Sequence, residues 1–288
     1  MNAYERLRIK PATFRHLTGL TVSEFEKLLA ELDQARKAHR EKQQRRPRRR
    51  RPGAGRRPKL GLAEQLTLVL IYYRTYVTQD FLGFLFAIDK GTACRIIQAV
   101  GLLLAGIFRI PERRVQIHPD EIAEAFIDAT ERPINRPSKQ QRRSYSGKKK
   151  RHTVKHQIIV VRKKKRGGRK KQKRKVRIAA VSAAAKGKVH DKKLYDRTKT
   201  VMPPNVASYG DTGYQGTALK TPKKKPKNGT LSKRQKRGNR RLSRKRVVVE
   251  HGIGKMKIWR IAAERYRNPL RRHTRIMKNV AGLHNRMF

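Results

Sequence analysis

The sequence lacks the features of secreted and membrane-spanning proteins. It has one cysteine, Cys94, which excludes an intramolecular disulfide and any zinc module built on paired cysteines. Its longest apolar runs, near residues 66–73 and 100–108, fall short of the roughly 18 residues that a spanning helix needs. The N-terminus shows no signal-peptide core. We therefore expect a soluble protein of the cell interior.

Acidic residues are also scarce. The chain of 288 residues carries 76 Lys and Arg against 20 Asp and Glu, a formal net charge of +56. Such a charge predicts a polyanionic partner. No basic amphipathic helix favours a membrane surface, so nucleic acid is the better prediction. After residue 131 the remaining acids are few, namely Asp191, Asp196, Asp211, Glu250 and Glu264.

The pattern predicts four segments. Residues 1–33 are nearly charge-balanced and helical, with Thr21 or Ser23 capping a helix whose apolar face carries Phe25, Leu28, Leu29 and Leu32. Residues 34–59 end in a dense basic run with Pro and Gly, which predicts a flexible linker, either a solvated spacer or an arm along DNA. Residues 60–112 form an apolar helical block, and residues 113–288 a larger domain.

Within residues 60–112, two helices flank a short break at residues 89–91. The first has Phe81, Leu82, Leu85 and Phe86 on its apolar face, and the second starts at Thr92. This spacing fits a helix-turn-helix, or equally a helical bundle that dimerises. In the helix-turn-helix reading, the side chains available to DNA are Lys90, Thr92, Arg95 and Gln98.

Three acids of the larger domain share a pattern. The apolar strand Ala125–Ile127 ends on Asp128, before Pro133 and Pro137 force a loop, and a short strand at residues 206–209 precedes Asp211. Glu250 lies inside a helix predicted over residues 239–266, with Arg246 and Lys257 on its face. Carboxylates brought together in a basic domain predict a cation, and their hard oxygens suit Mg²⁺. The competing readings are a turn or helix cap for each Asp and an exposed ion pair for Glu250.

Further elements complete the domain. Two strands around residues 162–175 predict a β-hairpin with a basic tip, and residues 220–241 a second basic loop, both suited to phosphates. His190-Asp191 opens a short helix, which Asp191 is expected to cap. A last helix is expected over residues 271–286.

These motifs resemble the DDE transposases of bacterial insertion sequences, close to the insertion-sequence-five group. The first block is Asp128-Ala129-Thr130-Glu131-Arg132-Pro133 with Tyr145-Ser146-Gly147-Lys148, and the second is Asp211-Thr212-Gly213-Tyr214-Gln215-Gly216. Arg246, Glu250 and Lys257 match the third signature, Y-x2-R-x3-E-x6-K. Ser243 stands at its Tyr position, a departure from the family.

The resemblance implies a fold and an activity. The fold is an α/β (α+β) domain with a ribonuclease-H-like mixed sheet flanked by helices, preceded by an all-α helix-turn-helix region. Asp128 would lie on the first strand, Asp211 after the fourth and Glu250 on the following helix. These carboxylates would hold two Mg²⁺ ions, with Mn²⁺ able to substitute, and His190 and Asp191 would support them from outside. Lys148, Arg246 and Lys257 would contact DNA.

The implied activity is cleavage of an element's ends and strand transfer to target DNA by two-metal phosphoryl transfer. The implied partner is double-stranded DNA with terminal inverted repeats, bound by a homo-oligomer in the prokaryotic cytoplasm near the nucleoid. Composition alone fits two alternatives: a non-enzymatic nucleic-acid-binding protein, such as a nucleoid or ribosome-associated factor or an inactivated transposase, and a ribonuclease-H-like nuclease.

Overall fold

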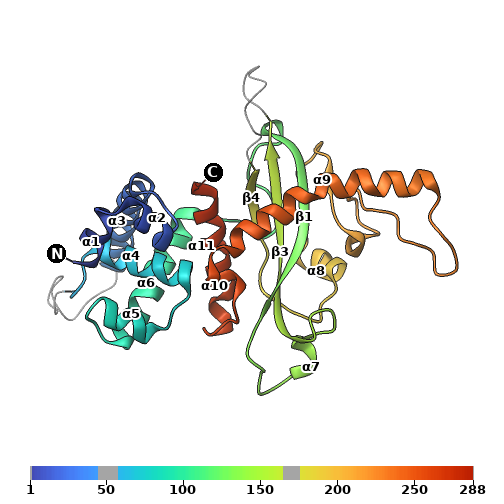
Figure 1. The fold of residues 1–288 in the computed structure, drawn as a ribbon. Helices are drawn as coiled ribbons and strands as arrows, with labels where there is room; N and C mark the ends of the chain where they lie inside the picture. The colour runs from blue at the N-terminus through green and yellow to red at the C-terminus, as the bar shows by residue number, and fades with distance from the viewer. Residues whose placement is uncertain (1, 45–57, 165–175, 288) are drawn as a thin grey trace. The chain divides into compact units, whose positions relative to one another are not determined.

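The computed structural model describes residues 2–44, 58–164 and 176–287. The chain forms two compact units (Figure 1). The N-terminal unit contains residues 1–109 together with residues 258–262. The C-terminal unit contains residues 110–257 and 263–286. The chain therefore returns to the first unit at residues 258–262, and Met287 is assigned to that unit as well.

The N-terminal unit is all helical. Its helices are α1 (Ala3–Arg8), α2 (Pro11–Thr18), α3 (Val22–Gln44), α4 (Leu62–Thr75), α5 (Gln79–Leu85) and α6 (Lys90–Phe108). Thr21 begins α3 with a capping box: its Oγ1 accepts from Glu24 N at 3.2 Å, and Glu24 Oε2 accepts from Thr21 N at 2.8 Å. Phe25, Leu28 and Leu32 are fully buried, as the sequence predicts.

Helix α3 continues further than the sequence suggests, into the segment predicted as linker. Residues 34–44 are rich in Ala, Gln, Lys, Arg and Glu, which favour helices, and Asp33 forms ion pairs with Arg36 and Lys37 one turn on. The rest of the basic run, residues 45–57, lies outside the described residues.

The turn between α5 and α6 also differs in detail. It covers residues 86–89, and α6 starts at Lys90, so Gly91 lies inside the helix. Asp89 is the N-cap, because its Oδ1 accepts from Thr92 N at 2.7 Å. Phe81, expected on the apolar face of α5, is 50% exposed. Leu82 and Phe86 are buried as predicted.

Helix α6 is more apolar than the sequence reading allowed. Among the described residues it is the helix long and apolar enough to cross a membrane by length and composition, with a mean hydropathy of 1.7. It contacts α3, α4 and α5, and it buries Ala93, Ile97, Val100 and Leu104. A core helix has these same properties.

Trp259 completes the core of the N-terminal unit. Its side chain is fully buried, and it packs so closely on Gly19 that a Cβ there would lie 2.7 Å from the indole Cη2. Gly19 also ends α2 with a φ of 76°, which glycine adopts without strain. The helix predicted over residues 239–266 is therefore wrong at its end: α9 (Lys233–Lys257) stops before Trp259, and α10 (Arg260–Ala263) follows.

The C-terminal unit is built on a mixed sheet in the order β2-β3-β1-β6, with β4 and β5 also paired to β3. The strands are β1 (Ile122–Pro133), β2 (Tyr145–Ser146), β3 (Arg151–Lys163), β4 (Val176–Val181), β5 (Ala185–Lys186) and β6 (Ser208–Tyr209). Among these strands, as far as the described residues show, only β1 and β6 pair in parallel. This is the predicted α/β architecture with an all-α region ahead of it.

The sequence predicts that the strand ends at Asp128, but β1 continues to Pro133. The sheet around it changes there. β6 pairs with Ala125 and Phe126, and β4 pairs with β3 no further than Ile158, which is the partner of Asp128. Beyond this point β1 and β3 continue with only the short β5 and β2 beside β3. Asp128 thus lies where the broad part of the sheet ends.

Helices pack on this sheet. α9 contacts β1, β3 and β4, and α11 (His273–Arg286) contacts β4. Val249, Ile253 and Met256 are the buried apolar side chains of α9, and Gly252 lies so close to Val160 that a Cβ would be 3.2 Å from it. Lys245 of α9 donates from Nζ to Glu124 Oε1 of β1 at 2.7 Å and to the Tyr209 hydroxyl of β6 at 3.0 Å. These contacts fix α9 along the sheet.

The remaining elements are η1 (Pro119–Glu121), α7 (Gln141–Ser144), α8 (Asp191–Thr198), η2 (Thr212–Tyr214) and η3 (Leu270–Arg272). Two basic segments differ from the prediction. Helix α9 begins at Lys233, inside the predicted loop 220–241, because Ser232 and Gln235 form a capping box. The predicted hairpin of β3 and β4 is present, but its tip, residues 165–175, lies outside the described residues.

Candidate active site

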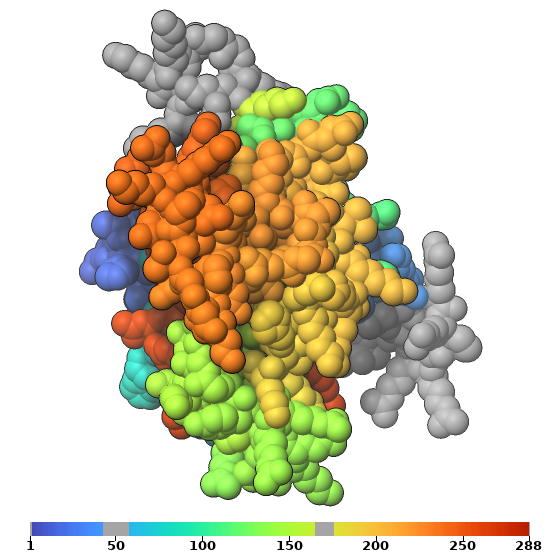
Figure 2. Space-filling model, turned by 90° about the vertical axis from the view of Figure 1, so that its right-hand side faces the viewer, coloured from blue at the N-terminus to red at the C-terminus, as the bar shows by residue number. Residues whose placement is uncertain are grey.

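Two of the predicted carboxylates face one cavity. It has a volume of about 250 Å³, and its lining includes Asp128 of β1 and Glu250 of α9. The other polar side chains that line it are Thr130, Glu131, Lys148, Lys149 and Lys257. Acids and ammonium groups therefore meet across the gap between the sheet and α9. Figure 2 shows α9 in orange, the segment around α8 in yellow and the segment around α7 and β2 in light green on one face of the C-terminal unit.

The environment of Asp128 disfavours its charge. Burial raises the pKa of its carboxyl to about 6, and the nearby carboxylates of Asp211 and Asp191 add to the rise. The backbone N–H of Ala129, which donates to Oδ1 at 2.8 Å, and the guanidinium of Arg246 act in the opposite direction. A positive charge placed beside Asp128 would therefore stabilise the ionised form of its carboxyl.

Asp211 stands on the loop after β6. Its Oδ1 accepts from Gly213 N at 2.8 Å and caps η2, so the side chain is fixed by its own backbone turn. A Cβ at Gly213 would lie 3.0 Å from Asp211 Oδ1 and 3.1 Å from Asp191 Oδ2, which places both carboxylates around this glycine. Because β6 runs parallel to β1, Asp211 is carried to the same end of the sheet as Asp128.

The donors suit a hard divalent cation, although the three predicted ligands are not gathered at one point. Asp211 does not line the cavity of Asp128 and Glu250. Within the described residues no group of three Asp, Glu, His or Cys side chains is close enough to hold a metal ion. The raised pKa of Asp128 nevertheless fits a cation site, because a bound cation would offset the burial and repulsion that raise it.

Comparison with known proteins gives the family. Residues 127–285 match the family model described as DDE superfamily endonuclease, and residues 58–109 match the helix-turn-helix of DDE superfamily endonuclease. The chain belongs to the DDE superfamily endonucleases. It is also 31% identical, over 239 residues, to the probable transposase for insertion sequence element IS702 of Microchaete diplosiphon, covering 80% of this chain and 82% of that one. No solved structure matches the chain.

These matches confirm the predicted resemblance, and with it a metal-dependent DDE enzyme that has a helix-turn-helix and acts on DNA. The family model starts at Ile127, one residue before Asp128, and includes Asp211 and Glu250. Which residues of this DDE endonuclease hold the metal and which contact DNA stays a prediction.

The structure of this endonuclease adds a buried network that the sequence reading missed. Lys155 of β3 lies between two carboxylates, with its Nζ 3.3 Å from Glu131 Oε1 and 2.9 Å from Asp191 Oδ1. The ammonium also donates to the Val189 carbonyl at 2.8 Å. The Lys155 side chain is only 8% exposed. Nothing local in the sequence marks this residue, because Lys155 lies in the polar first half of β3, between Val154 and His156.

Glu131 is the second member of this network, and it lines the cavity with Asp128 and Glu250. Burial disfavours its charge, but hydrogen bonds from Ser146, the ammonium of Lys155 and a hydrogen bond from Thr153 together hold its pKa below the usual range. Unlike Asp128, Glu131 is therefore an ionised carboxylate, and its oxygens already interact with Ser146, Thr153 and Lys155. Its role in the described structure is to hold Lys155.

Asp191 was expected to cap α8, and this prediction is wrong. The N-cap is His190, whose Nδ1 accepts from Lys192 N at 3.3 Å. Asp191 is instead the first helical residue, where a carboxylate is favoured by the helix dipole, and its side chain binds Lys155. The exchange places the Asp191 carboxylate near Asp128 and Asp211.

The predicted DNA-contacting residues fall in two places. Lys148 and Lys257 line the cavity with Glu250. Arg246 lies one turn before Glu250 on α9, and its positive charge acts to lower the pKa of Asp128. Ser243, at the family's Tyr position, is exposed. In the N-terminal unit, Lys90 pairs with Asp80 at 2.9 Å, Arg95 bonds to Thr92 Oγ1 at 2.8 Å, and Gln98 bonds to Cys94 Sγ at 3.1 Å.

Proposed function

We propose that this chain is the transposase of a bacterial insertion sequence, which cleaves the ends of its element and joins them to target DNA. The observation that carries the proposal is the cavity shared by Asp128 and Glu250, with Asp211 beside Asp128. The name of the 31% identical relative supports the biological role.

The proposed reaction is an in-line displacement at phosphorus. In the first step a water oxygen bonds to the phosphorus at the element's end, the bond to the 3′-oxygen breaks, and the 3′-oxygen leaves as a hydroxyl. In the second step that hydroxyl attacks a target phosphodiester and displaces another 3′-oxygen. Two Mg²⁺ ions held by Asp128, Asp211 and Glu250, or Mn²⁺ in their place, would supply activation of the attacking oxygen and neutralisation of the leaving one.

The chain's own side chains would place the DNA. Lys148, Lys149 and Lys257 line the cavity at the carboxylates and would bind the phosphates that flank the scissile bond. In the N-terminal unit, Arg95 is 73% exposed on α6 and is the best placed of the predicted residues to reach a base. Most of the rate would then come from placement and charge neutralisation.

The proposal includes the biological setting. The DNA partner would be the element's terminal inverted repeats and the target duplex, and the protein would act as a homo-oligomer on DNA in the prokaryotic cytoplasm, at the nucleoid. Two ends must be cut and joined together, which one active site per protomer achieves most simply when two protomers meet on DNA.

Substitution of the carboxylates tests the proposal. Asp128→Asn, Asp211→Asn and Glu250→Gln should each abolish Mg²⁺-dependent cleavage of a duplex carrying the element's end. Each should keep DNA binding, because each adds positive charge. Asp196→Asn, at an exposed acid of α8, makes the same charge change outside the cavity and should cleave normally.

The outcomes separate the alternatives. Cleavage that survives in one carboxylate variant removes that residue from the metal site. Cleavage of DNA without strand transfer identifies a nuclease. Tight binding of DNA by the unaltered chain, with no cleavage in Mg²⁺ or Mn²⁺, identifies a non-enzymatic binding protein or an inactive descendant.

A further inference from the structure

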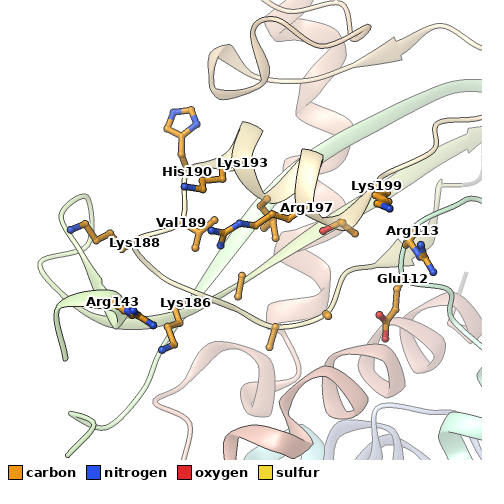
Figure 3. Close-up of a pocket in the computed structure, with 15 residues that line it drawn as sticks. Glu112, Arg113, Arg143, Lys186, Lys188, Val189, His190, Lys193, Arg197 and Lys199 are labelled. Atoms are coloured by element: carbon orange, nitrogen blue, oxygen red, sulfur yellow. The ribbon is translucent and has the colours of Figure 1, made fainter. Parts of the chain in front are cut away.

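A second and larger cavity lies in the C-terminal unit. Its volume is about 1150 Å³, and it is lined by the residues after β4, the β5 turn, α8 and the chain at Glu112 and Arg113 (Figure 3). Figure 3 shows Arg143, Lys186 and Lys188 toward one end and Arg113 and Lys199 toward the other, with Lys193 and Arg197 of α8 between them. We call this cavity the α8 groove.

The floor and rim of the α8 groove differ in character. Ala183, Ala184, Ala185, Val189 and Leu194 supply small or apolar surface, whereas seven basic side chains supply charge. Glu112 is the one acidic residue of the lining, and its carboxylate pairs with Lys278 at 2.9 Å. In the described parts of the chain, none of the seven basic groups is paired with a carboxylate. The groove is therefore a concave surface whose positive charge is not neutralised by the protein.

Lysines on a convex surface are solvated and need no partner. In a concave site, by contrast, their positive electrostatic potential is concentrated. Charges of one sign around a low-dielectric hollow focus their field into it. Lys193 and Arg197 stand four residues apart on α8, so they project from the same side of the helix. A ligand in the groove would meet cations from separate segments at once, which suits an extended polyanion better than a single small anion.

The α8 groove adjoins the acid cluster through one residue. His190 lines the groove, and the next residue, Asp191, holds Lys155 and lies near Asp128 and Asp211. Helix α8 then leads away from the cluster for eight residues, about 12 Å at 1.5 Å per residue. That length corresponds to the rise of about three to four base pairs along the axis of a DNA duplex, at about 3.4 Å each.

We propose that the α8 groove binds the phosphate backbone of a DNA strand that extends from the catalytic carboxylates. The inference rests on the proposed function for the direction of the strand, and it adds a substrate-holding surface that the sequence did not indicate. Its cations are scattered between residues 113 and 199, outside the dense basic runs. The sugar and base edges would lie toward the alanines, and the phosphates toward the basic rim.

The first test measures phosphate contacts. The full chain carrying Asp128→Asn is compared with the same chain carrying Lys193→Gln and Arg197→Gln, using a 30-base-pair duplex of arbitrary sequence. The log–log slope of affinity against salt should decrease in magnitude by about 1.8 for two lost contacts. Arg265→Gln with Arg271→Gln removes the same charge at exposed positions that line neither cavity and should change the slope by much less.

Equal slope changes in the two double variants would overturn the proposal, because the effect would then reflect net charge alone. This measurement uses no catalysis. If the unaltered chain never cleaves DNA while Lys193→Gln with Arg197→Gln still lowers the salt slope, the proposed function fails but the groove remains a DNA-binding surface.

The second test locates the strand. Because Cys94 is the only cysteine, Cys94→Ser with Lys193→Cys leaves a single thiol on the groove rim. Duplexes ending at the cleaved bond carry a disulfide-forming thiol tether on one chosen phosphate. We expect cross-links at phosphates within about four nucleotides of that end, and none with Arg271→Cys as the matched control. Cross-links spread evenly along the duplex, or equally strong in the control, would overturn the assignment.

Discussion

A single ammonium group, that of Lys155, holds two carboxylates beside the cavity of Asp128 and Glu250. Lys155, Glu131 and Asp191 have side-chain exposures of 8%, 9% and 23%, so their charges are largely withdrawn from water. Buried ions are tolerated only as a balanced set. The set also affects Asp128, because the carboxylate of Asp191 helps to raise the pKa of Asp128 and Lys155 holds Asp191 in place.

Lys155→Met should therefore destabilise the protein by about 3–5 kcal/mol, because it leaves two buried carboxylates without a counter-ion. Urea unfolding at pH 7 measures the loss. The triple variant Lys155→Met, Glu131→Gln and Asp191→Asn keeps similar shapes without charge and should recover a large part of it. A single variant as stable as the unaltered chain would show that the network contributes nothing to folding.

At this scale the sequence indicates candidate metal ligands but not the network of contacts around them. Asp128, Asp211 and Glu250 are recognisable because acids are rare in a basic background and follow or interrupt regular patterns. Lys155 is not recognisable, since its partner Asp191 is 36 positions away and one lysine among 76 basic residues carries no signal. The α8 groove was hidden for the same reason. Only the folded chain brings its scattered cations together.

Among the elements, β3 and α11 are joined by a pair of neutral histidines. His156 Nδ1 donates to the Ser182 carbonyl at 2.7 Å, so its Nε2 is the acceptor for His273 Nδ1 at 2.6 Å. The two rings are stacked, with centroids 4.8 Å apart. Burial lowers the pKa of His156 to about 4 and that of His273 to about 2, each with Arg132 adding to the shift.

The sign of the pH dependence follows from these values. Both folded pKa values lie below the unfolded value of about 6.5, so between about pH 6.5 and 4 the unfolded chain binds more protons. The stability from this pair is fully present above pH 6.5 and falls as the pH is lowered through that window. Each histidine contributes a slope of up to about 1.4 kcal/mol per pH unit.

We expect His273→Phe to reduce this loss of stability on acidification, because it removes one of the two groups. Urea unfolding at pH 7 and pH 5 gives the change. The measurement belongs in an Asp128→Asn background, since the raised pKa of Asp128 has the opposite effect over the same range. Equal acid sensitivity with and without His273 would show that this histidine is not buried in its neutral form.

The boundaries of elements show where local pattern fails. The capping boxes at Thr21 and at Ser232 both follow patterns that are readable from the sequence, and Thr21 lies at a predicted helix start. The end of α9 is not readable locally. Residues 258–263 continue a good helical pattern, and the break arises because Trp259 is buried among distant helices. Tertiary burial overrode helical propensity at that point.

At the scale of the whole molecule, reading of bases and chemistry are expected in different units. We predict that Arg95→Ala reduces the preference for the element's terminal repeat over random DNA by about 1–3 kcal/mol, if its guanidinium reaches a base. Competition binding by the full chain at one salt concentration measures this preference. Arg15→Ala, at an exposed residue of α2, removes the same charge and should keep it.

A result in which the two variants show the same preference would remove Arg95 from base recognition. Self-association through residues 60–112, with no preference for any sequence, would instead favour the dimerisation reading of these helices. Phe81 and Phe84, which are 50% and 86% exposed, supply an apolar surface for that outcome.

Trp259 should be a stability determinant although it lies far along the chain from the unit that it completes. Trp259→Ala is expected to cost about 3–5 kcal/mol, measured by thermal or urea unfolding. Its neighbour Ile258 is 49% exposed, and Ile258→Ala should change the free energy of unfolding by much less. Similar losses for both variants would show that the segment as a whole, rather than the indole, matters.

The return of residues 258–262 to the N-terminal unit also limits how this protein can be divided or recombined. A fragment ending near residue 110 lacks a core tryptophan, so weak or unstable binding by that fragment says little about the helices themselves. An exchange of residues 1–109 between relatives would transfer the helix-turn-helix unit without one of its buried core side chains. This unit is therefore not encoded by one continuous stretch of sequence. A recombined transposase would have to take residues 1–109 and residues 258–262 from the same parent to keep the core of the unit intact.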